Sequence, residues 1–170
     1  MIHVRVLGVA LDDSQQHVIL LKPVHELGGS GRLLPVWIGE QEATSILIAV
    51  QGGVPPRPLS HDLIVLMLQQ LGADVERVEV TRLSEGTFYA EITLTTPSGV
   101  KVIDARPSDA IAIAARTASP VWVADEVFDA AAIPDTVSDV EEIPSDGAEE
   151  EKVDEFRRFL DEVAPEDFEP

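Results

Sequence analysis

The segment that most restricts the fold of this chain is the run DARPSDAIAIAART, residues 104–117. Its helical part, residues 108–118, is apolar on nearly every side, so we expect a helix that other elements cover. The charged residues gather at its start, where Asp104, Arg106 and Asp109 lie within six positions. A helix that is covered on nearly every side requires a layered fold around it.

The rest of the first 124 residues supplies those layers. Apolar and β-branched runs separated by turn residues predict strands, and runs with apolar residues at helical spacing predict helices. The predicted strands are residues 2–11, 17–26, 32–39, 75–83, 87–96, 100–105 and 120–124. Two other helices are predicted. The first spans residues 40–51, and its apolar face consists of Ala43, Ile46, Leu47 and Val50. The second spans residues 61–71 between the N-cap Ser60 and the terminating Gly72, and its apolar face consists of Ile64, Met67, Leu68 and Leu71. Helices interspersed with hairpins favour an α+β fold, a mixed, largely antiparallel sheet layered with helices.

The negative charge of the chain is concentrated near its C-terminus. Residues 1–124 hold 13 acidic and 9 basic residues, whereas residues 125–170 hold 18 acidic and 3 basic. Such acidity is typical of a solvated linker, so we divide the chain into a domain at 1–134 and an acidic tail at 135–170. Within the tail, Val153, Phe156, Leu160 and Val163 are spaced as on a short amphipathic helix. That helix would either pack on its own domain or bind a partner, and a basic protein would suit the acidic tail.

Composition excludes several classes of function. The chain has no cysteine, which excludes a disulfide framework, a thiol nucleophile and a thiolate metal site. No run of about 18 apolar residues is present, and the N-terminus alternates rather than forming a cleavable apolar block. We therefore expect a soluble, cytoplasmic protein with no membrane partner.

Polar residues recur at the starts of three predicted helices. They are Glu40 and Glu42 in the first, Ser60, His61 and Asp62 in the second, and Asp104, Arg106, Ser108 and Asp109 in the third. Acidic and hydroxyl side chains at these positions commonly cap free amide groups and complement the helix dipole. Each of them taken singly fits that structural role, as Pro107 fits the first turn of a helix.

Arg106 and His61 admit a functional interpretation as well. Arg106 precedes a proline, which holds it extended, and it lies between two aspartates. It would either form an ion pair that stabilises the junction or present its guanidinium to a phosphate beside a helix N-terminus. His61 would be either a packed helix residue or a proton carrier near neutral pH.

The same residues carry a resemblance. The blocks LLPVWIGEQEA, RPLSHDL, EGTFYA and VIDARPSDAIA occur in an order that resembles the bifunctional nuclease family of bacteria and plants, over about residues 1–130. The resemblance implies an α+β domain that forms homodimers and hydrolyses both DNA and RNA with little sequence preference. Its motif residues in this chain are Glu40, Glu42, His61, Asp62, Asp104, Arg106, Ser108 and Asp109.

Phosphodiester hydrolysis needs an activated water and compensation for phosphate charge, from divalent ions or from basic side chains. The catalytic candidates are His61, which would act as the base, Asp104, Arg106 and Asp109. The candidates for binding the substrate are Arg106 and Ser108. Asp104, Asp109, Asp62 and Glu40 are the oxygen ligands available to a cation such as Mg²⁺, although the cofactor itself is unknown. The body carries no excess of basic residues, which leaves a second possibility: a non-catalytic dimeric interaction or regulatory module whose acidic tail meets a partner.

Overall fold

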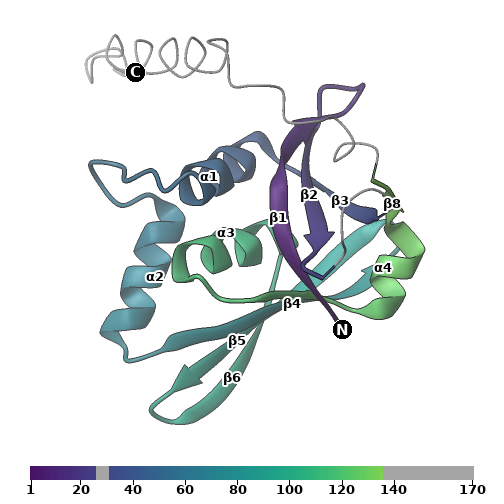
Figure 1. Cartoon of the computed structure of the whole chain (residues 1–170). Coiled ribbons are helices and arrows are strands. Elements are labelled where there is room, and N and C mark those ends of the chain that lie inside the picture. The colour runs from purple at the N-terminus through teal and green to yellow at the C-terminus, as the bar shows by residue number, and fades with distance from the viewer. Residues whose placement is uncertain (26–30, 136–170) are drawn as a thin grey trace, which may run out of the picture. The chain divides into compact units, whose positions relative to one another are not determined.

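Eight strands form the sheet of this protein, whose computed structural model describes residues 1–25 and 31–135 (Figure 1). The strands are β1 (Ile2–Leu11), β2 (His17–Pro23), β3 (Arg32–Ile38), β4 (Asp74–Ser84), β5 (Thr87–Thr96), β6 (Gly99–Ala105), β7 (Val121–Val123) and β8 (Ile133–Pro134). They lie in the order β6-β5-β4-β7-β1-β2-β3-β8. Every neighbouring pair is antiparallel except β4 with β7, which is parallel. The predicted fold class, α+β with a mixed and largely antiparallel sheet, is confirmed.

Four helices accompany the sheet. They are α1 (Glu40–Val50), α2 (Ser60–Gln70), α3 (Pro107–Thr117) and α4 (Asp125–Ala131). α3 packs against β4 and β5 and is flanked by α1 and α2, while α4 contacts β3 and β4 (Figure 1). None of the helices in the described residues has the length and hydrophobicity needed to span a membrane. The sequence did not predict α4 or β8, because elements this short carry too few residues to show a periodicity.

α3 is the covered helix that its sequence predicts. Its residues from Ala110 to Ala114 are at most 4% exposed, and they join one apolar core with side chains of the central strands. The predicted inward alternation of β5 is also confirmed, since Ala90, Ile92 and Leu94 are buried and Phe88 is half-buried. Burial of this helix fixes its two ends, and both ends carry an arginine.

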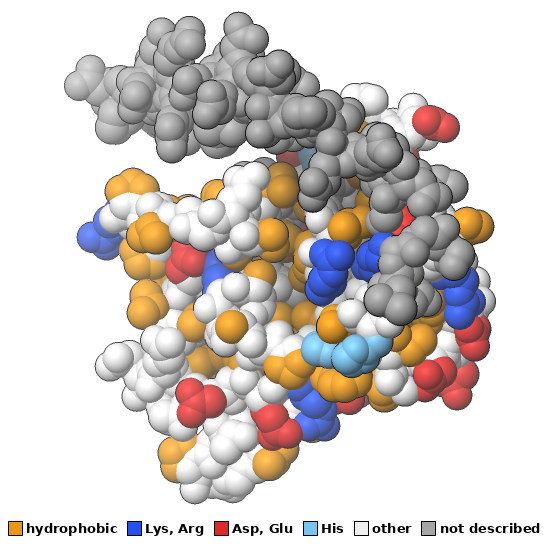
Figure 2. Space-filling view, in the orientation of Figure 1, with side chains coloured by type: hydrophobic (Ala, Val, Ile, Leu, Met, Phe, Trp, Pro, Cys, Tyr) orange, Lys and Arg blue, Asp and Glu red, His pale blue; other side chains and the backbone are white. Residues whose placement is uncertain are grey.

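α2 is less buried than its sequence suggested. Val65 is its buried residue, whereas three members of the predicted apolar face, Ile64, Met67 and Leu71, are 40%, 56% and 71% exposed. The helix lies at the margin of the layer and touches α3 along one narrow side (Figure 1). Figure 2 shows hydrophobic side chains at the surface over this helix. In α1, likewise, Ala43 and Ile46 are buried but Val50 is exposed.

The compact body of the protein ends at Asp135. Residues Met1–Asp135 form one unit, and the Asp135 side chain is buried, where it pairs with Lys22 on β2 at 2.6 Å. The predicted acidic tail beyond this residue and its amphipathic helix lie outside the described residues, so those predictions stand as they were made.

Candidate functional site

The N-terminus of α3 is built around an arginine rather than around a capping side chain. Arg106 occupies the N-cap with φ −69° and ψ 144°, the extended conformation that a following proline favours. Its Nε donates to Asp109 Oδ2 at 2.7 Å and its Nη2 to Asp109 Oδ1 at 3.0 Å, a two-pronged contact one turn into the helix. The Asp109 carboxylate is therefore used to hold Arg106 and does not cap the helix.

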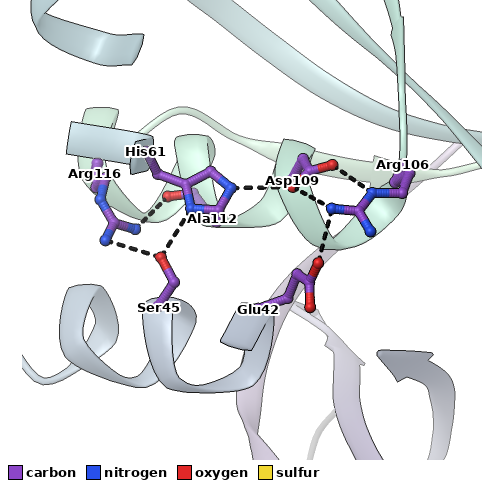
Figure 3. Close-up of polar contacts among 7 residues, drawn as sticks. All are labelled: Glu42, Ser45, His61, Arg106, Asp109, Ala112 and Arg116. Atoms are coloured by element: carbon purple, nitrogen blue, oxygen red, sulfur yellow. Dashed lines mark hydrogen bonds and ion pairs between the residues drawn. The ribbon is translucent and has the colours of Figure 1, made fainter. Parts of the chain in front are cut away.

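A second carboxylate reaches the same guanidinium from α1. Glu42 Oε1 lies 2.8 Å from Arg106 Nη2 (Figure 3). Glu42 is bent back over the first turn of its own helix, so closely that a Cβ at Gly39 would overlap its carboxylate. The glycine of the IGE block thus leaves room for this contact. The hydrogen bonds that Arg106 donates to Asp109 and Glu42 raise its pKa, so the group stays charged at every working pH.

His61, from the first turn of α2, links this ion pair to a hydroxyl. Its Nε2 lies 3.1 Å from Asp109 Oδ1, and its Nδ1 lies 2.9 Å from Ser45 Oγ on α1 (Figure 3). Ser45 Oγ accepts a hydrogen bond from Arg116 Nη2 at 3.1 Å, which leaves the hydroxyl proton free to point at Nδ1. In that arrangement the neutral imidazole carries its proton on Nε2 and donates it to Asp109.

Arg116 closes the network at the other end of α3. Its Nε donates to Asp62 Oδ1 at 2.5 Å and its Nη1 to the Ala112 carbonyl at 2.9 Å. Asp62 Oδ2 accepts from the Leu59 amide at 2.8 Å, so Leu59 rather than the predicted Ser60 is the N-cap of α2. Burial opposes ionisation of Asp62, but the Arg116 and Leu59 hydrogen bonds outweigh it and lower the pKa of this carboxyl.

The pKa of Asp109 is lowered in the same way. Burial raises it, and the hydrogen bonds from Arg106 and His61 outweigh that effect. Seven side chains therefore form one continuous polar network that joins three helices: Glu42, Ser45, His61, Asp62, Arg106, Asp109 and Arg116.

Two hollows of similar size meet at this network. The first encloses about 660 Å³ and is lined by Glu40, Gln41, Glu42, Thr44, Ser45, Ile48, Leu59, Ser60, His61, Ile64, Arg106 and Asp109. The second encloses about 640 Å³ and is lined by Gln15, Gln16, His17, Val36, Trp37, Ile38, Gly39, Glu40, Gly86, Thr87, Phe88, Arg106, Pro107 and Ser108. Glu40 and Arg106 line both, so they mark the boundary between the hollows.

The network lies within a recognised domain. The model of the bifunctional nuclease domain matches residues 19–136, which include every residue of both hollows except Gln15, Gln16 and His17. The chain belongs to this family. The bifunctional nuclease domain therefore accounts for most of the body and for all three helices of the site.

Relatives of known sequence agree with this membership. An uncharacterized protein of Mycobacterium tuberculosis is 40% identical over 165 residues, which cover 97% of this chain and 96% of that protein. Bifunctional nuclease 1 of Arabidopsis thaliana is 28% identical over 107 residues, covering 61% of this chain and 32% of the plant protein. Bifunctional nuclease 2 of the same plant is 32% identical over 86 residues, covering 49% and 26%.

Most of the site residues predicted from the sequence lie in or next to the two hollows of this bifunctional nuclease domain, but Asp104 does not. Glu40, Glu42, His61, Arg106 and Asp109 line the first hollow, and Ser108 lines the second. Asp104 is exposed on β6, opposite Glu91 of β5, and lines neither hollow. The reason is the direction of the chain: Asp104 belongs to the edge strand, whereas the helix begins only after Arg106.

The four predicted cation ligands do not assemble. Across residues 1–25 and 31–135, no group of three His, Asp or Glu side chains is placed to hold a metal ion. Asp62 is engaged by Arg116, Asp109 by Arg106 and His61, and Asp104 lies apart, which leaves Glu40 as the uncommitted carboxylate of the first hollow. These residues do not fit a ready cation site, so the chemistry below is argued from the side chains themselves.

Sequence reasoning missed Ser45 and Arg116, which the network of this family member requires. Neither belongs to a helix start, and Ser45 has no charge to draw attention. Arg116 did carry a signal, because a lone charge near the end of an otherwise apolar covered helix needs a partner from another element.

Proposed function

We propose that this protein is a nuclease that hydrolyses phosphodiester bonds of both DNA and RNA with little sequence preference. One observation carries the proposal beyond family membership. An exposed guanidinium, that of Arg106, is held by two carboxylates at the mouth of a hollow whose wall includes His61. A fixed planar cation beside an imidazole is the pair of groups that phosphoryl transfer needs for charge compensation and proton transfer.

Arg106 is the group we assign to the phosphate. Its side chain is 65% exposed, and Asp109 and Glu42 engage its Nε and Nη2 atoms. The Nη1 atom makes no hydrogen bond to any residue that the structure describes, so its two hydrogens remain available to phosphate oxygens. The two carboxylates orient the guanidinium and keep it from swinging into solvent.

His61 is the group we assign to proton transfer. Its side chain is 12% exposed, and its contacts with Ser45 and Asp109 fix the ring. As a general acid, His61 would give the proton on its Nε2 to the leaving oxygen, while the fixed charge of Arg106 offsets part of the charge of the approaching phosphate.

Glu40 is the group we assign to the attacking water. It is exposed, it lines both hollows, and its carboxylate has no hydrogen bond or ion pair among the described residues. A carboxylate with no committed partner can accept a proton from water, and it is also the group that a divalent cation would first meet.

The deciding experiment uses the full chain, purified free of host nucleases, with end-labelled single-stranded DNA and RNA of the same mixed sequence. We expect both to be cleaved, and His61→Gln and Arg106→Gln to remove most of the cleavage. Arg77→Gln is the matched control, because Arg77 pairs with Glu76 and Glu79 on a strand surface outside both hollows. Equal cleavage by all four preparations would show a contaminating enzyme and end the proposal.

The same assay with EDTA tests whether a cation takes part. Cleavage that survives EDTA would be the work of Glu40, His61 and Arg106 alone. Cleavage that EDTA abolishes and Mg²⁺ restores would show that a cation binds with the substrate, and Glu40→Gln should then raise the Mg²⁺ concentration required.

A second function, that of a homodimeric interaction module, is favoured by the surface of α2. The apolar side chains of Leu63, Ile64, Leu66, Met67 and Leu71 on this helix are 40–71% exposed. A contiguous apolar face of this kind is typical of a protein interface. We propose that two copies associate through it.

Light scattering on the full chain tests this association. Met67→Glu should convert a dimer into a monomer, because it places a charge in the apolar contact. Leu11→Glu is the control, since Leu11 is 52% exposed on β1, away from α2. A monomeric wild type, or a Met67→Glu protein that stays dimeric, would remove α2 from consideration.

A further inference from the structure

The second hollow has a chemistry different from that of the first. Its walls come from the ends of β2 and β3 and from the β4–β5 turn, and they carry three rings, those of His17, Trp37 and Phe88. No carboxylate lines it except Glu40 at the boundary with the first hollow. An aromatic hollow of about 640 Å³ falls within the range that organic ligands occupy.

Trp37 is held there in a fixed and open position. Its side chain is among the exposed large hydrophobic ones, with 53% of the residue accessible. Its indole Nε1 donates to Asp12 Oδ2 at 2.9 Å, and Asp12 Oδ1 in turn accepts from the amides of Ser14 and Gln16 at 2.8 and 2.9 Å. The polar atom of the indole is thus satisfied by a side chain of the protein, and what remains for a ligand is the ring itself.

The carboxylate that accepts the hydrogen bond of Trp37 is charged. The amide of Gln16 and then the indole of Trp37 lower the pKa of Asp12, so this carboxylate is ionised at neutral pH. An ionised acceptor makes the stronger hydrogen bond to the indole. A large apolar ring kept at the surface by a dedicated acceptor has little structural purpose, because its burial would contribute more to stability than its exposure.

Arg106 connects the hollow of Trp37 with the proposed phosphate site. It lines both hollows, so a chain whose phosphate contacts Arg106 would extend from the first hollow into the second. Successive phosphates and bases of a single strand are covalently linked, and aromatic side chains that bind single strands stack on bases next to a contacted phosphate.

We propose that the second hollow is a subsite for an unpaired base of single-stranded nucleic acid, which stacks on Trp37 while its neighbouring phosphate lies at Arg106. This inference rests on the proposed nuclease function and specifies its substrate. Stacking is tolerant of sequence because every base has a π-face, which agrees with hydrolysis of little sequence preference. A base inside a duplex is already stacked on its neighbours and cannot enter, so single strands are the preferred substrate.

Intrinsic fluorescence provides a direct test, because the chain has two tryptophans, Trp37 and Trp122. Trp122 stacks on His3 with the ring centroids 4.6 Å apart, and it lines neither hollow. In a full-length Trp122→Phe protein Trp37 is the sole tryptophan, and excitation at the red edge of the absorption band separates it from Tyr89. The probes are an oligothymidylate and an abasic oligomer of equal length, which carries the same phosphates without bases. We expect the first to quench Trp37 and the second to leave it unchanged.

Affinity measurements on variants complete the test. Trp37→Leu should weaken binding of oligothymidylate by about five-fold or more, the lower limit for loss of one stacked base, and leave binding of the abasic oligomer unchanged. Trp37→Phe keeps a ring and should retain most of the affinity. Trp122→Leu is the matched control and should alter neither. Circular dichroism of each variant checks the fold.

The outcomes separate the subsite from the nuclease. If oligothymidylate and the abasic oligomer bind equally well and Trp37→Leu changes neither, the subsite is refuted while hydrolysis can still stand. If the wild type neither binds nor cleaves single strands, the proposed function fails and the subsite fails with it. Equal quenching by a duplex of the same length would refute the selection for unpaired bases.

Discussion

The two ends of α3 carry the same pair of groups in opposite environments. At the start of the helix Arg106 binds Asp109 and Glu42 with its side chain 65% exposed, and near the end Arg116 binds Asp62 with its side chain 8% exposed. An exposed ion pair contributes little to folding because water competes for both partners. A buried pair cannot lose a partner without leaving a charge in the interior.

This difference indicates which arginine is structural. Arg116 also donates to the Ala112 carbonyl and to Ser45, so each of its three guanidinium nitrogens has a partner inside the protein. Arg106 keeps donors at the mouth of a hollow. The same arginine–carboxylate pairing therefore holds three helices together at one end of α3 and is available to a ligand at its other end.

The largest expected effect comes from breaking the buried end. Arg116→Gln leaves the Asp62 carboxylate with only the Leu59 amide as a hydrogen-bond donor. We expect the free energy of unfolding to fall by about 2 kcal/mol, between the values for exposed and fully buried pairs, because Arg116 is 8% exposed and Asp62 is 24% exposed. Urea denaturation measures it. A loss below about 1 kcal/mol, the range of exposed pairs, would show that the pair is solvated in solution.

Breaking the exposed end should affect activity instead of stability. For Arg106→Gln we expect a loss of cleavage of about 100-fold, the size seen when one group that stabilises transition-state charge is removed. The free energy of unfolding should change by less than about 1 kcal/mol, because the pair is exposed. Cleavage assays and urea denaturation on the same sample test both statements. Unaltered cleavage combined with a large loss of stability would reverse the roles of the two arginines.

Ser45 joins the two ends, so its removal should produce an intermediate effect. Ser45→Ala deletes the hydroxyl between Arg116 and His61, and we expect a loss of about 1 kcal/mol of stability. It should also reduce cleavage about ten-fold, because the His61 ring would keep one anchor in place of two. The double variant Ser45→Ala with Arg106→Gln separates these effects. Strict additivity of the two losses of cleavage would argue that Ser45 and Arg106 act independently.

The smallest expected effect is a change in the pH dependence of the free energy of unfolding at acidic pH. The pKa values of Asp62 and Asp109 are lower in the folded protein than the usual value of about 3.9. Their contribution to stability is therefore present above about pH 4 and is lost as the pH falls through the folded pKa values. Asp62→Asn and Asp109→Asn should each flatten the dependence of unfolding on pH below pH 4. An unchanged dependence in either variant would mean that its arginine does not lower the pKa of that aspartate in the folded protein.

Local patterns predicted much of the fold but only part of the site. The burial of α3 and the charges at its start are visible in a few consecutive residues, because helical period and charge position are properties of a short segment. The contact of Arg116 with Asp62 spans 54 residues, and that of Arg116 with Ser45 spans 71. No local pattern states which helix will lie across from another, so these partners emerged only from the packing.

The helix α2 was predicted, but its exposure was not, for a related reason. An apolar stripe at helical spacing reveals that a helix has an apolar face and does not reveal which surface covers it. In the structure Val65 meets the core and Met67 and Leu71 lie at the surface. Amphipathicity alone does not distinguish burial within one copy from burial between molecules.

The position of β7 determines when the sheet can be completed during synthesis. β1 to β3 and β4 to β6 are two sets of hairpins whose strands are neighbours in the chain, and the three residues of β7 are inserted between them. Each set can form as soon as it has been made, but Val4 and Val78 gain their shared partner, Val121, only when the chain has reached that residue. Until then the growing chain leaves the edges of β1 and β4 that face β7 unpaired, and unpaired edges of this kind can pair with strands of other molecules.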